Sequence, residues 1–393
     1  MRALSRRRFL ETGLLVGLGS ALGAPGLRGI AFAAPEAALP LVVLIHFRGG
    51  CDGLNLISPA NDPAFVAVRN IDLRVLDSGS EAGRRLANGP TPAIDFRLHP
   101  SAARLAEFYE GKQLAFIHAA GLSTAQRSHF VAIDMMDRGV ADPTSLSRVA
   151  SGWATRHLSR LPGAASVSAA AALAGELHGD GAALAIPDVN GGFAVPGGPQ
   201  ADAVLTRLYA DAPGAIGAAG RATLAAIRLI DARLSRDGQN KPLPYQPAAG
   251  VNYDPGGDLG RALRTVAQLV KMDIGLAFAT VDIGGWDTHE NQPGRFKNAV
   301  ERLSNGLGAF WDDMHDRHDR TIVVAMGEFG RRLRSNRSNG VFPMQSRRLR
   351  PMASVLADDS VQSGFFAVCM RANVPLSCFE LPLVQFDASA ASQ

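Results

Sequence analysis

The sequence predicts an α/β fold with a mostly parallel central sheet flanked by helices. Four apolar runs of strand length each precede a polar segment, and helix-length patterns separate them along the chain. The runs span residues 41–47, 113–118, 276–283 and 321–326. Strands that alternate with helices are typical of βαβ units, which form parallel sheets. Because ligands in open α/β sheets bind at the carboxyl ends of the strands, we expect one shared site at that edge.

The segments between these runs have the spacing of amphipathic helices. Apolar residues recur every three to four positions, as one buried helix face requires. We interpret the aromatic side chains of the longest apolar stripe as core. The expected helices span residues 101–110, 127–138, 205–210, 220–235, 258–272 and 296–314.

The N-terminal segment predicts export. Residues 5–10 read Ser-Arg-Arg-Arg-Phe-Leu, a weakly apolar, glycine-rich stretch follows at residues 12–22, and Ala31-Phe32-Ala33 is a small-x-small cleavage site. This order is typical of a twin-arginine signal, with an amphipathic anchor or a transit peptide as the alternative. We expect residues 1–33 to engage the twin-arginine export machinery. The mature protein would then be periplasmic or cell-surface, without a transmembrane segment.

The charge of the mature chain argues against nucleic-acid binding. The 393-residue chain has a formal net charge of +4, and residues 1–33 hold five arginines against one glutamate, which is also +4. The mature chain is therefore near neutral, without the basic footprint of a nucleic-acid binder. Its three cysteines are too few for a disulfide framework. Cys51, beside the predicted site, is open to three interpretations: a packed small residue, a metal ligand or a nucleophile.

The strongest chemical signal follows the third apolar run. Asp287 and His289 lie in the segment Gly-Gly-Trp-Asp-Thr-His at residues 284–289. A carboxylate and an imidazole at the mouth of a buried strand are suitable ligands for a divalent metal such as Zn, Mg, Ca or Mn. The alternative is a hydrogen-bonded pair that holds a loop.

Two further carboxylates follow other strands and are expected to join the same metal site. Asp52 comes after the first run, and Glu328 comes after the last. The alternatives are an Asp-Gly turn for Asp52 and an ion pair with Arg331 or Arg332 for Glu328. His46 and His118 lie within apolar runs, so we interpret them as structural.

The segment before the second helix predicts an anion site with catalytic residues. Ser128 at a helix start would have backbone N–H groups and the helix dipole favouring a bound anion. Arg48 and Arg127 could grip such an anion, as substrate-binding residues. Ser128 is also a common N-cap residue, so capping is the alternative. His129 is open as a ligand, a general acid or a core histidine.

Several motifs together resemble the bacterial "domain of unknown function 1501" family. They are Arg-Gly-Gly-x-Asp-Gly-Leu-Asn (residues 48–55), Arg-Ser-His-Phe (127–130), Gly-Gly-Trp-Asp-Thr-His (284–289) and Gly-Glu-Phe-Gly-Arg (327–331). That family is grouped with the alkaline phosphatase and sulfatase superfamily. The resemblance covers about residues 40–340. It implies an alkaline phosphatase-like sheet with metal ligands on strand-end loops.

The resemblance also implies roles for individual residues. Asp52 is similar to the superfamily's first metal-binding aspartate, and Asp287 and His289 resemble its Asp-and-His metal pair. Glu328 lies where another strand-end ligand is expected. Ser128, or alternatively Thr124, occupies the region of the nucleophile.

The last part of the chain departs from the family pattern. Family members continue with an Asn-x-x-Gly-Thr-Asp-His-Gly stretch, whereas residues 336–343 read Asn-Arg-Ser-Asn-Gly-Val-Phe-Pro. Of 42 glycines, one follows Val341. We therefore divide the chain into a signal (1–33), an α/β domain (34–340) and an atypical tail (341–393). The tail is either a subdomain or the product of a frameshift, and we expect it to pack poorly.

Two functions follow from these observations. The first is an exported metal-dependent hydrolase of phosphate or sulfate esters, acting on a small anionic substrate. The second is a non-catalytic exported binding or assembly protein on a hydrolase-like fold. The missing Asp-His pair predicts an incomplete metal site and slight or absent activity.

Overall fold

A seven-stranded sheet forms the centre of the protein in the computed structural model, which describes residues 39–86, 93–120, 122, 128–161, 163–342 and 365–371. The strand order is β5-β10-β9-β1-β8-β6-β7. β1 pairs in parallel with β8 and β9, and β6 pairs in parallel with β7 and β8. β10 is antiparallel to both of its neighbours. The predicted mostly parallel sheet is therefore confirmed.

The four apolar runs identified in the sequence are all strands of this sheet. They have the strand lengths and the apolar character of elements covered on both faces. Three further strands, β6, β7 and β10, were not predicted. The bounds are β1 Leu41–Phe47, β5 Leu114–Ala120, β6 Ala165–Ser168, β7 Leu184–Ala185, β8 Leu276–Ile283, β9 Thr321–Gly327 and β10 Phe365–Met370. A second small sheet, in the order β2-β4-β3, consists of β2 Ile57–Pro59, β4 Phe96–Leu98 and β3 Arg84–Arg85.

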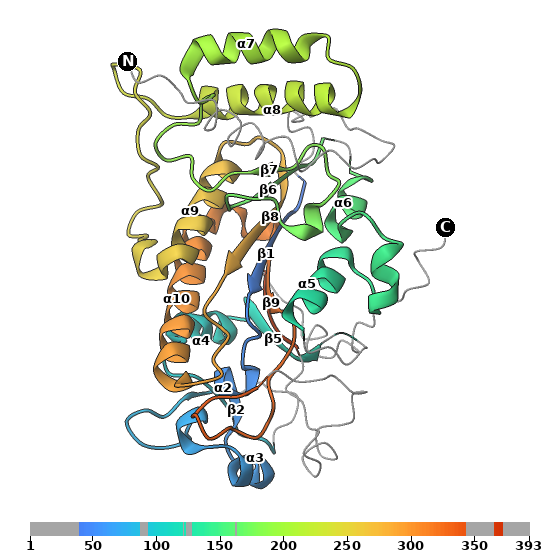
Figure 1. The fold of residues 1–393 in the computed structure, drawn as a ribbon. Helices are drawn as coiled ribbons and strands as arrows, with labels where there is room; N and C mark the ends of the chain where they lie inside the picture. The colour runs from blue at the N-terminus through green and yellow to red at the C-terminus, as the bar shows by residue number, and fades with distance from the viewer. Residues whose placement is uncertain are drawn as a thin grey trace.

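Helices cover both faces of the large sheet (Figure 1). α4, α9 and α10 lie on one face, α5 and α6 lie on the other, and α7 and α8 form a hairpin at one end. Each predicted helix is present, although α7 and α8 begin well before the predicted residues 205 and 220, and α2, α3 and α6 were not predicted. The bounds are α2 Gly53–Leu56, α3 Pro63–Val68, α4 Ala103–Glu110, α5 His129–Arg138, α6 Trp153–Leu158, α7 Gly198–Ala210, α8 Gly214–Arg233, α9 Gly257–Lys271 and α10 Gln292–Asp313. Short 3₁₀ turns include η3, Gly175–Leu177.

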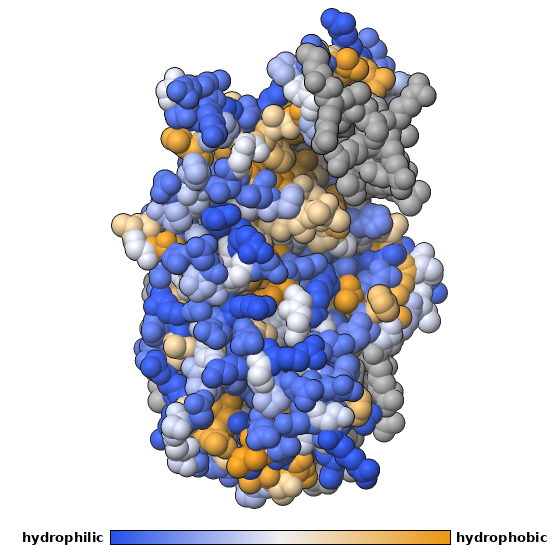
Figure 2. Space-filling view, turned by 60° about the vertical axis from the view of Figure 1, so that its left-hand side comes forward, coloured by the Kyte–Doolittle hydropathy of each residue, from blue (hydrophilic) through white to orange (hydrophobic). Residues whose placement is uncertain are grey.

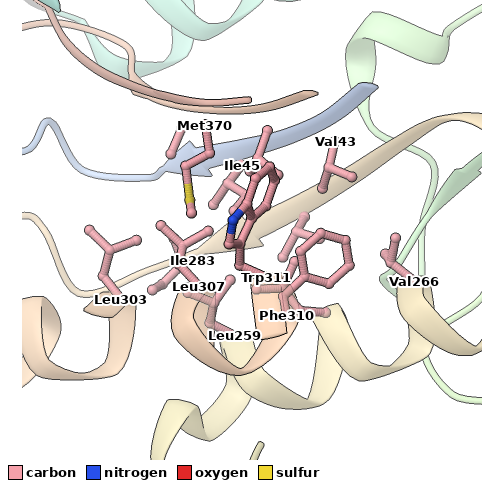
Figure 3. Packing of buried hydrophobic residues seen from close by; sticks show 14 of the residues in the cluster. Val43, Ile45, Leu259, Val266, Ile283, Leu303, Leu307, Phe310, Trp311 and Met370 are labelled. Atoms are coloured by element: carbon pink, nitrogen blue, oxygen red, sulfur yellow. The ribbon is translucent and has the colours of Figure 1, made fainter. Parts of the chain in front are cut away.

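The main core lies between the sheet and the helices α9 and α10. Figure 3 shows Phe310 and Trp311 of α10 packed with Val43 and Ile45 of β1. Their side chains are at most 1% exposed. Burying a side chain of this size contributes about 1.5–3 kcal/mol relative to leaving it in water. The aromatic stripe of α10 is therefore core, as predicted.

The other face of β1 packs against α6. Because side chains alternate across a strand, Leu44 joins a separate cluster with Ala154, Leu158 and Leu177. His46 has the same parity as Leu44, so it faces α5, α6 and η3 rather than the main core. This placement determines what His46 can contact.

Residues 365–370 form a strand of the sheet, contrary to the expectation that the tail packs poorly. β10 inserts between β5 and β9, and Val368 and Met370 are 1% exposed. Met370 joins the main core beside α10 (Figure 3). The physical reason is the apolar run Phe-Phe-Ala-Val-Cys-Met, which has strand length and pairs on both edges. Residues 343–364 and 372–393 lie outside the described residues, as does the predicted signal at residues 1–33.

The surface carries hydrophobic residues in small groups. Figure 2 shows a largely hydrophilic face, with hydrophobic residues gathered in separate patches. Exposed large apolar side chains include Val204, Leu208 and Ile216 on the α7–α8 hairpin. Within the described ranges, every helix is too short or too polar to span a membrane.

Candidate metal site at the carboxyl edge of the sheet

Three loops leave the sheet side by side because the central strands end in register. Phe47 at the end of β1 pairs with Ile283 of β8 and with Gly327 of β9. The segments that follow these strands must therefore meet at one edge. Gly49 shows how closely they meet, since a Cβ there would overlap the backbone of Asp287. Its φ of +114° also favours glycine.

Glu328 holds His129 at this edge. The Oε1 atom of Glu328 accepts a hydrogen bond from the backbone N–H of Gly49 at 2.8 Å and lies 2.6 Å from Nδ1 of His129. A carboxylate can only accept, so Nδ1 of the neutral ring carries the proton and Nε2 keeps its lone pair. The ring also packs on Phe329, with centroids 4.5 Å apart. His129 thus presents Nε2 towards the loop after β8.

Asp287 and His289 contact each other on that loop. Nε2 of His289 lies 2.6 Å from Oδ1 of Asp287, and Nε2 of His129 lies 3.9 Å from the same oxygen. His129, Asp287 and His289 each offer one ligand atom, and these atoms all lie within 4.8 Å of one another. We call these three residues the edge cluster. All three side chains are partly exposed, so a small solute can reach them.

Arg331 is the fixed cation of the site. Its side chain is fully buried, and Nη2 donates to Oδ1 of Asp287 at 2.7 Å. The same guanidinium donates to the carbonyl groups of Gly50 at 2.7 Å, Val341 at 3.0 Å and Trp286 at 3.3 Å. A planar fork with five N–H groups suits such a convergence of acceptors. Arg331 therefore joins the three strand-end loops and neutralises part of the charge on Asp287.

His289 is held in its neutral form. Burial and the adjacent Arg331 guanidinium lower the pKa of His289 below its usual value, although Asp287 and a hydrogen bond with Val341 oppose the shift. Nη1 of Arg331 lies 3.2 Å from Nδ1 of His289. A neutral imidazole is the form that binds metals. The carbonyl group of Val341 can accept an Nδ1 proton when Nε2 binds a cation.

The residues of the edge fit a divalent cation in donor type. Two imidazoles and a carboxylate are a common Zn²⁺ donor set. Within the described part of the chain, the second oxygen of Glu328, Oε2, is buried and has no hydrogen-bond partner. An unpaired buried acceptor is costly, but Glu328 is not one of the three residues whose ligand atoms group together. Arg331 would oppose cation binding, because its positive charge is already paired with the carboxylate of Asp287.

Asp52 lies in a different network. It is fully buried, and its Oδ2 atom pairs with Arg69 and accepts from Nε2 of Gln292 at 2.6 Å. Thr288, between the two edge-cluster residues in sequence, bonds to Oε1 of the same Gln292 at 3.0 Å. Asp52 is therefore linked to the edge through Gln292, and it is not one of the three grouped ligands.

The remaining predicted site residues are placed as follows. Ser128 is the N-cap of α5, and its Oγ accepts from the N–H of Val131 at 3.4 Å. Arg48 donates from Nε to Asp282 at 3.0 Å, and its Nη2 lies 3.0 Å from the same carboxylate. Arg127 and Thr124 lie outside the described residues.

Sequence reasoning missed two features. An ion pair of Glu328 with Arg331 or Arg332 was the alternative to metal binding, whereas Arg331 pairs with Asp287. The signal available was the Arg331-Arg332 pair shortly after a strand, which does not specify a partner. His46 was interpreted as a structural histidine, yet it groups with the distant carboxylates of Asp137 and Glu176.

Comparisons agree with the family suggested by the sequence motifs. Residues 249–341 match the model of the family described as "Protein of unknown function (DUF1501)", which confirms the resemblance over that segment. Among curated proteins, none matches this chain.

Several solved structures resemble the chain loosely. The C-terminal periplasmic domain of EcEptC from Escherichia coli, in complex with Zn, has 8% identity, a TM-score of 0.39, and coverage of 91% of this chain and 80% of that one. A protein in the alkaline phosphatase superfamily from Vibrio parahaemolyticus has 11% identity, a TM-score of 0.36, and coverage of 95% and 70%. Alkaline phosphatase from the Antarctic bacterium TAB5 has 10% identity, a TM-score of 0.32, and coverage of 86% and 92%.

Proposed function

We propose that this protein is an exported, divalent-cation-dependent hydrolase of phosphate or sulfate esters. The observation that carries the proposal is the convergence of His129, Asp287 and His289 within 4.8 Å at the carboxyl edge of the sheet. His129, Asp287 and His289 would hold the cation, with Glu328 fixing the proton of His129 on Nδ1. The cation, when bound, would neutralise ester oxygens and favour displacement at phosphorus or sulfur.

Ser128 is our candidate nucleophile. It directly precedes His129 at the start of a ten-residue helix, where free N–H groups and the dipole favour an anionic ester. Attack would form a bond from Oγ to phosphorus or sulfur and break the ester bond to the leaving oxygen. The Ser128 proton would pass to the leaving group through water. A water molecule would then attack the phosphorus or sulfur atom of the ester formed on Ser128, break its bond to Oγ, release phosphate or sulfate and restore the hydroxyl group. Arg48 and Arg127 remain proposed contacts for the anion.

The test uses mature protein that was exported in the folded state. Chelation should abolish hydrolysis of p-nitrophenyl phosphate or sulfate, and Zn²⁺, Mn²⁺ or Mg²⁺ should restore it. Asp287→Asn should lose both the cation and turnover, whereas Glu328→Gln should lose about 10–100-fold in affinity or activity. His315→Gln is a matched control because His315 is exposed and away from the edge. Turnover that survives chelation and Asp287→Asn would overturn the proposal.

Arg331 favours a second candidate function, a non-catalytic exported binding or assembly protein. In this interpretation the Asp287–Arg331 pair is a lock for the three loops, and no cation is needed. The same experiment separates the two functions. A protein that binds no cation and hydrolyses neither ester, yet folds cooperatively, would support the binding protein.

Export is proposed from the twin-arginine pattern. Replacing Arg6 and Arg7 by lysine should leave uncleaved precursor inside the cell. Fractionation followed by N-terminal sequencing of the exported form checks both the route and the cleavage after Ala33. Export of the double-lysine variant at the normal rate would contradict the route.

A further inference from the structure

A second group of potential ligands lies inside the protein, on the opposite face of β1 from the main core. It consists of His46 on β1, Asp137 on α5 and Glu176 on η3, and we call it the inner cluster. The three residues are 2%, 7% and 0% exposed. Nε2 of His46 lies 3.0 Å from Oε1 of Glu176. One ligand atom from each residue lies within 4.8 Å of the others.

The inner cluster is distinct from the edge cluster. Asp137 lies eight residues after His129 on the same helix, which corresponds to about 12 Å along the helix axis. The three members of the inner cluster come from β1, α5 and η3, and none of them belongs to the edge cluster. A cation at the inner cluster is therefore independent of the function proposed for the edge cluster.

The charges of the inner cluster are incompletely compensated. Two carboxylates face one imidazole. The charge of the nearby Arg48 acts on both carboxylates, but its ion pair is with Asp282. Among the residues that the structure describes, Oδ1 of Asp137 and Oε2 of Glu176 are buried without a hydrogen-bond partner. Buried carboxylates are normally paired or coordinate a metal, because an isolated buried charge is very costly. Burial and the neighbouring Glu176 accordingly raise the pKa of Asp137 to about 7.

The backbone is shaped to bring these groups together. Gly175 directly precedes Glu176, and a Cβ at that position would overlap the carboxylate of Asp137. A Cβ at Gly152 would likewise overlap the carbonyl group of Glu176. Two glycines thus allow η3 to approach α5 and α6 without a steric barrier.

We propose that His46, Asp137 and Glu176 form a structural site for a first-row divalent cation such as Zn²⁺ or Mn²⁺. One imidazole and two carboxylates match the ligand preferences of these ions. The two positive charges of the ion balance the two carboxylates, and the orphan oxygens gain a partner. The cation would tie α5 and η3 to β1. It would thereby fix the helix whose first residue is His129.

Zn²⁺ binding to the chelator-treated mature chain tests the proposal, with bound metal measured by equilibrium dialysis and elemental analysis. Glu176→Gln should bind one equivalent of Zn²⁺ less than the wild-type chain, and Asp287→Asn should keep the inner ion. If the edge cluster also binds, the wild-type chain holds two equivalents and each variant holds one. If the edge cluster does not bind, the counts are one for the wild-type chain, none for Glu176→Gln and one for Asp287→Asn. The failure of one site is therefore distinguishable from the failure of the other.

Thermal unfolding separates a metal ligand from a residue with a merely structural role. Ligand binding to the folded state raises Tm by mass action. Zn²⁺ should therefore raise the Tm of the wild-type chain, and this rise should shrink in Glu176→Gln. In chelator, Glu176→Gln should unfold at the same temperature as the wild-type chain or higher, because one of two adjacent carboxylates is removed.

If Glu176→Gln does not fold, Asp137→Asn serves as the second variant. Equal Zn²⁺ content and equal Tm shifts in the wild-type chain and the variant would overturn the proposal, as would a wild-type chain that binds no Zn²⁺. A proton or water would then satisfy the cluster.

Discussion

The edge cluster and the inner cluster both combine imidazole and carboxylate groups, two imidazoles with one carboxylate at the edge and one imidazole with two carboxylates inside, but they differ in how their charge is compensated. At the edge, the buried Arg331 bonds to the carboxylate of Asp287, and the ligands are partly exposed. Inside, Asp137 and Glu176 face a single imidazole, and two of their oxygens have no partner in the described ranges. Exposure suits a site that exchanges substrate, whereas full burial suits an ion that stays with the fold. The comparison teaches that a potential metal site is judged by its counter-charges as well as by its ligands.

The largest effect that the comparison predicts concerns Arg331. Arg331→Gln removes donors from several buried carbonyl groups and from Asp287, so the free energy of unfolding should fall by about 3–5 kcal/mol. Urea unfolding followed by circular dichroism measures this loss. Arg332→Gln is the matched control, because Arg332 is adjacent to Arg331 in sequence but has an exposed side chain. A loss below about 1 kcal/mol, the usual limit for a surface pair, would mean that the edge does not depend on this counter-charge.

His99 provides a reference outside both clusters, as a titratable side chain whose charge is opposed by burial and by a nearby lysine. Burial and the nearby Lys297 lower its pKa from 6.5 to about 4. Between these values the unfolded chain binds more protons than the folded one, so stability falls as the pH falls from about 6.5 to about 4. The loss should reach about 3 kcal/mol at most.

The variant His99→Asn isolates this effect. Nδ1 of His99 accepts a hydrogen bond from the backbone N–H of Ser101 at 3.2 Å, and an asparagine oxygen can replace that acceptor without titrating. Urea unfolding of both proteins at several pH values gives the comparison. If the two stability curves stay parallel below pH 6.5, His99 is not the titrating group.

Gly175→Ala tests how closely η3 packs against Asp137 in the inner cluster. The added Cβ would overlap the carboxylate of Asp137, so the free energy of unfolding should fall by about 1–3 kcal/mol. Gly294→Ala is the matched control, since no atom of the described residues outside its own surroundings would lie within 4 Å of the added Cβ, and Gly294 is in the first turn of α10. That variant should be neutral or slightly stabilising. Equal effects at the two glycines would show that η3 does not press against Asp137.

Ser128 gives the smallest predicted change in stability and separates capping from catalysis. Ser128→Ala should cost about 1 kcal/mol of stability, because the N-cap hydrogen bond to Val131 is lost. Ser128→Asn keeps a good cap and removes the hydroxyl group. The asparagine variant should therefore be as stable as the wild-type chain and should not hydrolyse an ester. Full activity in Ser128→Asn would exclude Ser128 as the nucleophile.

Four strands of the large sheet, β1, β5, β8 and β9, and the meeting of their loops at one edge could be predicted from the sequence, because both depend on local pattern. Runs such as residues 276–283 are apolar over strand length, and parallel strands bring their carboxyl ends together. Asp287 and His289 follow such a strand directly. The family motif over residues 249–341 agrees with this segment.

The pairing of side chains could not be predicted, because it depends on contacts distant in sequence. Asp52 meets Arg69 and Gln292, and the latter is 240 residues away. His46 and Glu176 are separated by 130 residues. Neither pairing leaves a periodic signal. β10 was overlooked because its apolar run follows a segment with an atypical composition.

Anomalous X-ray diffraction from crystals of the mature protein grown with Zn²⁺ tests the central claim most directly. Data collected on both sides of the zinc absorption edge locate the ion without reference to activity. We predict a zinc-specific peak bounded by His129, Asp287 and His289, and its loss in Asp287→Asn. An edge cluster without such a peak, with Arg331 still bonded to Asp287, would contradict the metal site and leave the loop-locking function in its place.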